Sequence, residues 1–443
     1  MLFFRVLIEQ RGVRTAEDLL PLYERTAREL GAENAIPALK TIEGWIYEGR
    51  KPQRTFRPVL ERMLGYPLEQ LWAEIPEGNR PNTNRGWAGA SPTHFHVDVG
   101  VDLNEMKRTG AMAALRAKEF LLGKDRGAVG EDTLGLLDDD VQRLVLAYPR
   151  EPLNVVWDDL LATQDQVFRL LEGGRVRPSQ LRDLYFKASL LSFLVAKGFN
   201  DMDSPHQAVT MTRVAAACAK DAEHDGLIAL TDGLKSLIAY WAGKHEEARH
   251  YASQGAEFAA NQQGTVGLWL LGLKARAAAA GGDAETARTA NRQAADRRER
   301  VILDDLDGLG GLFTYPEEKQ SYYEVETEAL LGNGDPALVR QAELAVEGFS
   351  DPTSPNWAFG DLAGSQCDLA LVRLFSGDID GAAAAMRPVL DLPASHRNNG
   401  IVVSAQRVRQ ELERGPARSA VVVRDLRAEI EAFPAGRPAL PPG

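Results

Sequence analysis

LIAYWAGKHEEARH, at residues 237–250, contains the most informative pattern in this 443-residue chain. A helical run ends in a small-residue turn at Gly243, and a second helical run opens with Gly-Lys-x-x-x-Ala-Arg. Variants of the pattern recur at residues 273–291 (LKARAAAAGGDAETARTAN), 328–344 (EALLGNGDPALVRQAEL) and 369–386 (LALVRLFSGDIDGAAAAM). The chain therefore contains internal repeats, and each copy predicts two helices joined by a tight turn.

Each copy places a glycine in its turn: Gly243, Gly282, Gly334 and Gly377, spaced 39, 52 and 43 residues apart. Glycine readily adopts the positive φ that follows a helix end. A more degenerate copy is predicted at residues 185–220, with its turn near residues 198–204. Because each hairpin leaves one face uncovered, neighbouring hairpins stack into a superhelix. The pattern resembles a degenerate form of the tetratricopeptide repeat, and a non-repeating helical bundle is the alternative.

Composition divides the chain into four parts. Residues 1–76 read as a small helical domain, 77–104 as a linker, 105–433 as the repeat domain, and 434–443 as a disordered Pro- and Gly-rich tail. The predicted fold class is all-α. No run approaches the ~20 apolar residues of a membrane span, a signal peptide is not expected, and two cysteines exclude a disulfide framework. These features predict a cytoplasmic protein with no membrane partner.

The charge is unevenly distributed between these parts. The whole chain carries a formal charge of -12, yet residues 1–76 contain eleven basic and eleven acidic residues. Within that domain, six basic residues gather between residues 40 and 62 against three acidic ones. A locally basic patch on an acidic protein suits a small DNA-contacting surface.

The N-terminal domain predicts five short helices. The first covers residues 2–11, the second runs over residues 16–30 from a capping box at Thr15 and Asp18, and the third starts at Pro37. The fourth and fifth cover residues 55–64 and 67–73. Helical spacing predicts that the second helix buries Leu19, Leu22, Tyr23, Thr26 and Leu30. In the third helix the predicted buried stripe is Leu39, Ile42, Trp45 and Ile46.

The other side of the third helix is polar. A helix that enters the major groove needs this two-sided construction, with an apolar side held by a supporting helix and a polar side towards the bases. The candidates for contacts to base edges are Lys40, Thr41, Glu43 and Tyr47. Basic side chains beyond the helix can hold the flanking phosphates, and the candidates there are Arg50, Lys51, Arg54 and Arg57.

Two runs carry a resemblance to a known family: TIEGWIYEGRKP at residues 41–52 and VLERMLGYPLEQL at residues 59–71. They resemble actinobacterial regulators of the phage-repressor (Xre) type, in which a Trp and a Gly lie close to the recognition helix and basic residues and a Pro follow it. In such regulators a tetratricopeptide-like half follows the helix-turn-helix domain. The resemblance implies a DNA-binding transcriptional regulator.

The repeat domain offers a groove for a peptide or a small molecule. The candidate ligand-binding residues are Tyr240, Trp241, Trp269, Asn291, Arg292, Tyr322 and Trp357, although aromatic residues at such positions more often belong to the core. The long insertions at residues 304–320 and 351–364 are the predicted functional loops.

Other chemistry is not indicated by the sequence. The pair His94 and His96 lacks further nearby ligands for a metal, and the glycines at residues 308–311 lack the Lys-Ser/Thr of a phosphate-binding loop. No enzyme motif, metal site or cofactor is predicted. We therefore expect a homodimeric regulator that binds a palindromic operator and senses a ligand. The alternative is an interaction scaffold of tetratricopeptide type whose helix-turn-helix module does not bind DNA.

Overall fold

A computed structural model describes residues 4–5, 8, 13, 15–64, 68–72, 130–173, 176–415 and 418–436. The chain divides into two compact units, Met1–Val101 and Asp102–Gly443, here called the N-terminal and C-terminal units. All regular structure in the described ranges is helical, with no strand. The linker predicted at residues 77–104 and the start of the predicted repeat domain lie outside these ranges. So does most of the predicted tail, but Phe433–Gly436 forms the short helix η6, so the described chain stays ordered beyond residue 434.

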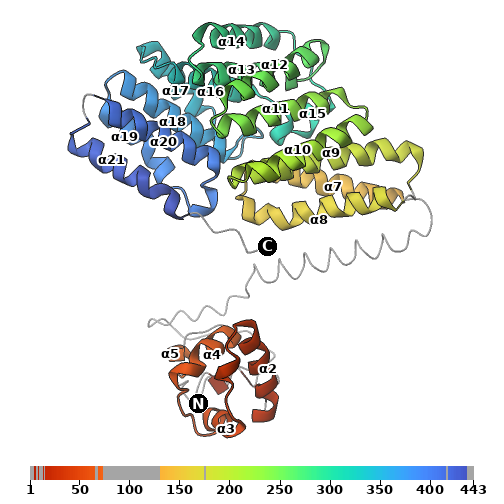
Figure 1. Ribbon diagram of the computed structural model, residues 1–443, viewed down its shortest axis with the longest axis vertical. Helices are drawn as coiled ribbons and strands as arrows, with labels where there is room; N and C mark the ends of the chain where they lie inside the picture. The colour runs from red at the N-terminus through yellow and green to blue at the C-terminus, as the bar shows by residue number, and fades with distance from the viewer. Residues whose placement is uncertain are drawn as a thin grey trace, which may run out of the picture. The chain divides into compact units, whose positions relative to one another are not determined.

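The N-terminal unit is built on α2 and α3 (Figure 1). Its elements are α2 (Ala16–Glu29), η1 (Glu33–Ala35), α3 (Leu39–Ile46), η2 (Arg54–Phe56), α4 (Arg57–Leu64) and α5 (Leu68–Leu71). The predicted capping box is present: the Thr15 hydroxyl accepts from the Asp18 amide at 3.2 Å, and the Asp18 carboxylate accepts from the Thr15 amide at 3.0 Å. The helices pack around one core, in which Phe4, Leu19, Tyr23, Ile42, Trp45, Leu60 and Leu71 are buried.

Three residues predicted to be buried in this unit are partly exposed. Leu22 and Leu30 of the α2 segment expose 38% and 44% of their surface, and Leu39 at the start of α3 exposes 40%. The buried side of α2 is centred on Leu19 and Tyr23, so Leu22 and Leu30 fall at its edges. Leu39 is the first residue of a helix of eight residues, which begins two positions after Pro37. The prediction for these three leucines was therefore wrong, whereas Ile42, Trp45 and Ile46 are buried as predicted.

The C-terminal unit is an array of paired helices that follow one another round an arc, from α7 and α8 to α19 and α21 (Figure 1). Its helices are α7 (Glu131–Ala147), α8 (Leu153–Glu172), α9 (Pro178–Asp201), α10 (Pro205–Asp221), α11 (Asp225–Trp241), α12 (His245–Phe258), α13 (Val266–Ala280), α14 (Ala284–Arg298), α15 (Asp305–Leu309), α16 (Glu317–Leu330), α17 (Pro336–Glu347), α18 (Phe359–Phe375), α19 (Ile379–Leu390), α20 (Asn399–Arg414) and α21 (Val421–Ala432). Over the described part of the chain, no helix has the length and apolar character that a membrane span requires.

The predicted turn glycines are confirmed at three of the four copies. Gly243, Gly282 and Gly377 have φ of 73°, 81° and 87°, each directly between paired helices. In the remaining copy the positive φ belongs to Gly332 instead of Gly334. Gly334 serves a different purpose, because a Cβ at this position would lie 2.4 Å from the backbone carbonyl carbon of Phe375. A glycine spacing in the sequence cannot distinguish a turn from a close approach between two backbones.

We expect Gly334→Ala to destabilise the C-terminal unit more than Gly282→Ala. At Gly282 the new methyl group meets nothing within 4 Å, so the loss is the backbone strain of about 1 kcal/mol. At Gly334 the methyl group clashes with backbone that cannot rotate away, and overpacking of this kind costs about 1–3 kcal/mol. Urea denaturation of the full chain measures both losses. Equal losses would contradict the close approach.

The two ends of the helical array touch. The Phe359 amide donates to the Pro149 carbonyl at 3.2 Å, and the Arg150 guanidinium donates to the carbonyls of Pro352, at 3.0 Å, and Ser354. In addition, α8 packs against η5 (Ala394–His396), and α9 packs against α20. The array is therefore closed on itself, and its inner surface surrounds a cavity.

Candidate functional site

The first candidate surface is the exposed side of α3 in the N-terminal unit. Lys40 and Glu43 are exposed, Thr41 is half-buried, and Tyr47, directly after the helix, exposes 53% of its surface. The opposite side of α3 is fixed by Trp45, whose ring lies 6.1 Å from that of Tyr23 in α2 and 5.6 Å from that of Phe56 in η2. Three of the four base-edge candidates thus lie on one short helix that is held from behind, and Tyr47 directly follows it.

The second feature of this surface is the basic segment that follows α3. Arg50, Lys51 and Arg54 are exposed, and Arg50 pairs with Glu48 at 2.5 Å. The segment begins at Gly49, which has a φ of 67°. A hydrogen bond fixes its position, because the Gly49 carbonyl accepts from the Trp72 indole at 2.9 Å. Arg57 differs from the other three candidates, because it is half-buried and its Nε donates to the Pro52 carbonyl at 3.2 Å.

The second candidate site is a cavity of about 410 Å³ inside the C-terminal unit. Three of the predicted ligand residues, Trp241, Trp269 and Tyr322, line it. The other four do not: Tyr240, Asn291, Arg292 and Trp357. Tyr240 is buried behind the wall, Asn291 and Arg292 lie on α14, and Trp357 packs against the apolar core. Tyr240 was thus predicted on the correct helix, one residue away from the lining position.

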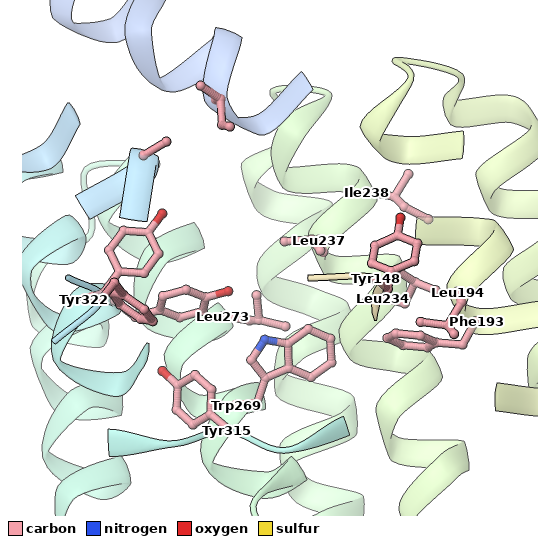
Figure 2. Packing of buried hydrophobic residues seen from close by; sticks show 14 of the residues in the cluster. Tyr148, Phe193, Leu194, Leu234, Leu237, Ile238, Trp269, Leu273, Tyr315 and Tyr322 are labelled. Atoms are coloured by element: carbon pink, nitrogen blue, oxygen red, sulfur yellow. The ribbon is translucent and has the colours of Figure 1, made fainter. Parts of the chain in front are cut away.

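Figure 2 shows the Trp269 side chain between Tyr315 and Tyr322 on one side and Tyr148 and Phe193 on the other. All five of these residues line the cavity. Both predicted functional loops also contribute to its wall. The insertion at residues 304–320 supplies Leu312, Phe313, Thr314, Tyr315 and Lys319, and the insertion at residues 351–364 supplies Ala358, Phe359, Gly360, Asp361 and Gly364.

Two lysine–carboxylate pairs lie on the cavity wall. Lys197 contacts Asp201 at 2.5 Å, and the other oxygen of Asp201 accepts from the Tyr148 hydroxyl at 3.0 Å. Lys319 contacts Asp361 at 3.0 Å, and both side chains are mostly buried. Burial lowers the pKa of Lys319, but the Asp361 carboxylate raises it, and the net direction is upward. Lys319 is therefore charged, and each carboxylate has a lysine partner.

A buried charge cluster lies behind the aromatic wall and joins four helices. Glu326 of α16 contacts Arg276 of α13 at 2.5 Å and Arg407 of α20 at 3.0 Å, and it accepts from the Tyr240 hydroxyl of α11 at 2.7 Å. Arg276 and Glu326 each expose 1% of their surface. The Arg276 guanidinium also lies over the rings of Tyr240 and Tyr323, at 4.6 and 4.1 Å from their centroids. Arg276 reaches the cavity wall, so the cluster adds charge to the site.

The protonation states in this cluster follow from burial and charge. Burial raises the pKa of Glu326, but the charges of Arg276 and Arg407 lower it. The net direction is downward, so Glu326 is ionised. Asp368 of α18 is also buried, and its Oδ2 has no hydrogen-bond partner among the described residues. Burial, followed by the charge of Glu326, raises the pKa of Asp368 well above its usual range. Burial and Glu326 thus favour the protonated form of Asp368, and the two guanidinium groups both pair with the Glu326 carboxylate.

Sequence reasoning missed Arg276, Glu326, Arg407 and the pair Lys197–Asp201. A signal for Arg276 exists in hindsight: α13 reads VGLWLLGLKARAAAA, a helix apolar on every side, so an Arg within it has to be buried and paired. The partner could not be identified, because Glu326 lies 50 residues away, and Arg407 is 81 residues beyond Glu326. No comparable signal marks Lys197 and Asp201.

Metal and thiol chemistry find no support in the described ranges. No group of three or more His, Cys, Asp or Glu residues there is arranged to hold a metal ion, and His94 and His96 lie outside these ranges. Cys218 and Cys367 are both buried and free. In comparisons with known proteins, no protein-family model and no curated protein matches this chain.

Proposed function

We propose that this protein is a sequence-specific DNA-binding transcriptional regulator. In this proposal α2 and α3 form a helix-turn-helix, and the closed helical array is a body of tetratricopeptide type that dimerises and senses a ligand. The observation that carries the proposal is α3 itself. It has an apolar side locked against α2 and η2, a polar side exposed at Lys40, Glu43 and Tyr47, and exposed basic residues directly after it.

These features suit the two kinds of contact that DNA offers. Side chains on a rigid helix can reach base edges in the major groove. Arg50, Lys51 and Arg54 stand where they would hold phosphates on either side of that groove. The acidic remainder of the chain, which carries the whole net charge of -12, would repel DNA and restrict contact to this one surface.

The test is a genome-wide DNA pull-down with the full chain at about 0.15 M salt, where weak electrostatic binding is largely screened. A homodimer that presents two α3 helices predicts enrichment of a short inverted repeat. Enrichment of no sequence, with and without a cell extract to supply a ligand, would favour the interaction scaffold instead.

Replacing Arg50 and Arg54 together by alanine is expected to weaken DNA binding on all sequences alike. Phosphate contacts carry no sequence information, and each contributes about 0.9 to the slope of log K against log salt, so the slope should fall by about 2. Fluorescence anisotropy of an enriched DNA fragment over a salt series measures this slope. Arg169→Ala is the control, because Arg169 is similarly exposed and pairs with Asp165 in the C-terminal unit. An unchanged slope in the double variant would contradict the phosphate assignment.

A further inference from the structure

The cavity has the size of a small-molecule site. Ligand pockets in proteins span roughly 300–1,000 Å³, and this one measures about 410 Å³. Its wall comes from α8, α9 and the segment between α7 and α8 at one end of the array, and from α18 and α20 at the other. The contacts between Pro149 and Phe359, and between Arg150 and Pro352, close the array around it. These boundaries suit a compact molecule better than an extended peptide.

Aromatic rings dominate the wall. The lining contains Tyr148, Trp157, Phe193, Trp241, Trp269, Phe313, Tyr315, Tyr322, Tyr323 and Phe359. Rings stack or meet edge to face, and such pairs are favourable beyond the area they bury. A planar aromatic molecule complements this wall better than a flexible aliphatic chain does.

The wall and the charge cluster behind it together carry surplus positive charge. Lys197 and Lys319 are each balanced by one aspartate, but Arg276 on the wall and Arg407 behind it have only Glu326 between them. Arg397, also on the wall, donates to the carbonyls of Leu392 and Phe433. The acidic cavity residues without such a pair, Glu151 and Asp158, are exposed, so water screens them. A buried charge without a partner is unfavourable, and an anionic group of a ligand would supply the missing partner.

Free hydrogen-bond donors at Lys319 point to the same group. Lys319 lines the cavity, and its ammonium has three protons and one carboxylate partner, Asp361, so it retains donors for a ligand. A carboxylate accepts such charge-assisted hydrogen bonds from an ammonium group.

We propose that the cavity binds a compact aromatic carboxylic acid, with its ring against the aromatic wall and its carboxylate directed to Lys319. The inference deepens the sensing part of the proposed function, because it names the chemical class of the ligand. It requires no DNA, so binding of the acid and binding of DNA can succeed or fail independently.

Isothermal titration calorimetry of the full chain tests the proposal with three probes: 2-naphthoate, the uncharged 2-naphthamide, and octanoate. We expect 2-naphthoate to bind at least about tenfold more tightly than 2-naphthamide, since a hydrogen bond to a charged group contributes this much. We also expect it to bind more tightly than octanoate, which has the carboxylate without the ring. Equal affinity for acid and amide, an advantage for octanoate, or no binding of 2-naphthoate at about 1 mM would each overturn the proposal.

A double variant, Lys319→Met with Asp361→Asn, then locates the carboxylate. The variant removes both charges of one pair, so the net charge of the cavity is unchanged and no lone aspartate is left buried. The preference for 2-naphthoate over 2-naphthamide is expected to disappear. The matched control is Lys244→Met with Glu247→Gln, a pair at 3.4 Å on the exposed start of α12, which should keep the preference. Because the wild-type comparison of acid and amide needs no variant, poor folding of the double variant would leave the proposal testable. A retained preference in a folded double variant would overturn the assignment to Lys319.

Discussion

Replacement of Glu326 by glutamine is expected to lower the free energy of unfolding of the C-terminal unit by about 3–5 kcal/mol. Glutamine has nearly the same shape, so the loss does not come from packing. It comes from charge, because Arg276 and Arg407 both pair with Glu326, and Arg276 exposes only 1% of its surface. Without the carboxylate, the almost fully buried Arg276 guanidinium loses the anion that pairs with it.

The same helix provides a matched control. Glu328 lies two residues further along α16 and pairs with Arg288 at 2.8 Å, but the Arg288 side chain is half exposed. Exposed ion pairs contribute about 0–1 kcal/mol, so Glu328→Gln should have a small effect. Urea denaturation of the full chain, followed by circular dichroism, measures both variants. A loss below about 1 kcal/mol for Glu326→Gln would show that the cluster does not hold its helices together.

The buried cluster also predicts a partial rescue. Changing Arg276 to methionine in the Glu326→Gln background removes the unpaired charge and keeps an apolar side chain of comparable length in its place. Replacing whole buried ion pairs by apolar residues is often neutral or stabilising. We therefore expect the double variant to be more stable than Glu326→Gln alone. The opposite order would indicate that Arg276 contributes mainly through its aromatic contacts with Tyr240 and Tyr323.

Trp45→Ala is expected to unfold the N-terminal unit and leave the C-terminal unit intact. Trp45 exposes 2% of its surface and joins α2, α3 and η2 through Tyr23 and Phe56. Truncation of a buried Trp costs about 3–5 kcal/mol, and a core of this size rarely supplies more than that. Specific DNA binding should be lost with the fold, whereas binding of 2-naphthoate should remain.

Amide hydrogen exchange resolved by peptide checks this separation. Peptides from α2 and α4 should lose protection in Trp45→Ala, and those from α9 to α20 should keep it. Tyr47→Ala is the control, because Tyr47 follows the same helix but exposes 53% of its surface. Its peptides should stay protected. Lost protection in the C-terminal helices would mean that the two units do not fold independently.

Much of the helical array could be predicted from the sequence because local signals specify it. Gly243, Gly282 and Gly377 mark turns through their positive φ, which few other residues adopt without strain. The signal failed at Gly334, because a glycine can allow either a turn with positive φ or a close approach between two backbones. Gly334 lies beside a turn but is required by the backbone of Phe375, on a helix 41 residues away in the chain.

The candidate site could be predicted only in part, for a similar reason. Trp241, Trp269 and Tyr322 stood out as aromatic residues on predicted helices, and the two insertions stood out by length. Whether a given aromatic residue lines the cavity or lies behind its wall depends on the rotation of its helix, which separates Trp241 from Tyr240. Pairings such as Arg276 with Glu326 depend on contacts between distant helices, which no local pattern encodes.

The contact between the two ends of the array changes how it can unfold. In an open array of repeats each hairpin touches only its neighbours, so the terminal hairpins fray one at a time. Here the hydrogen bond from Phe359 to Pro149 and the contacts of Arg150 give the first hairpin a partner near the last. Neither end can then detach without opening this seam, so fraying that begins at one end also breaks contacts of the other. A molecule bound in the cavity would touch residues from both ends, so by its presence it would slow the loss of the helices at both ends.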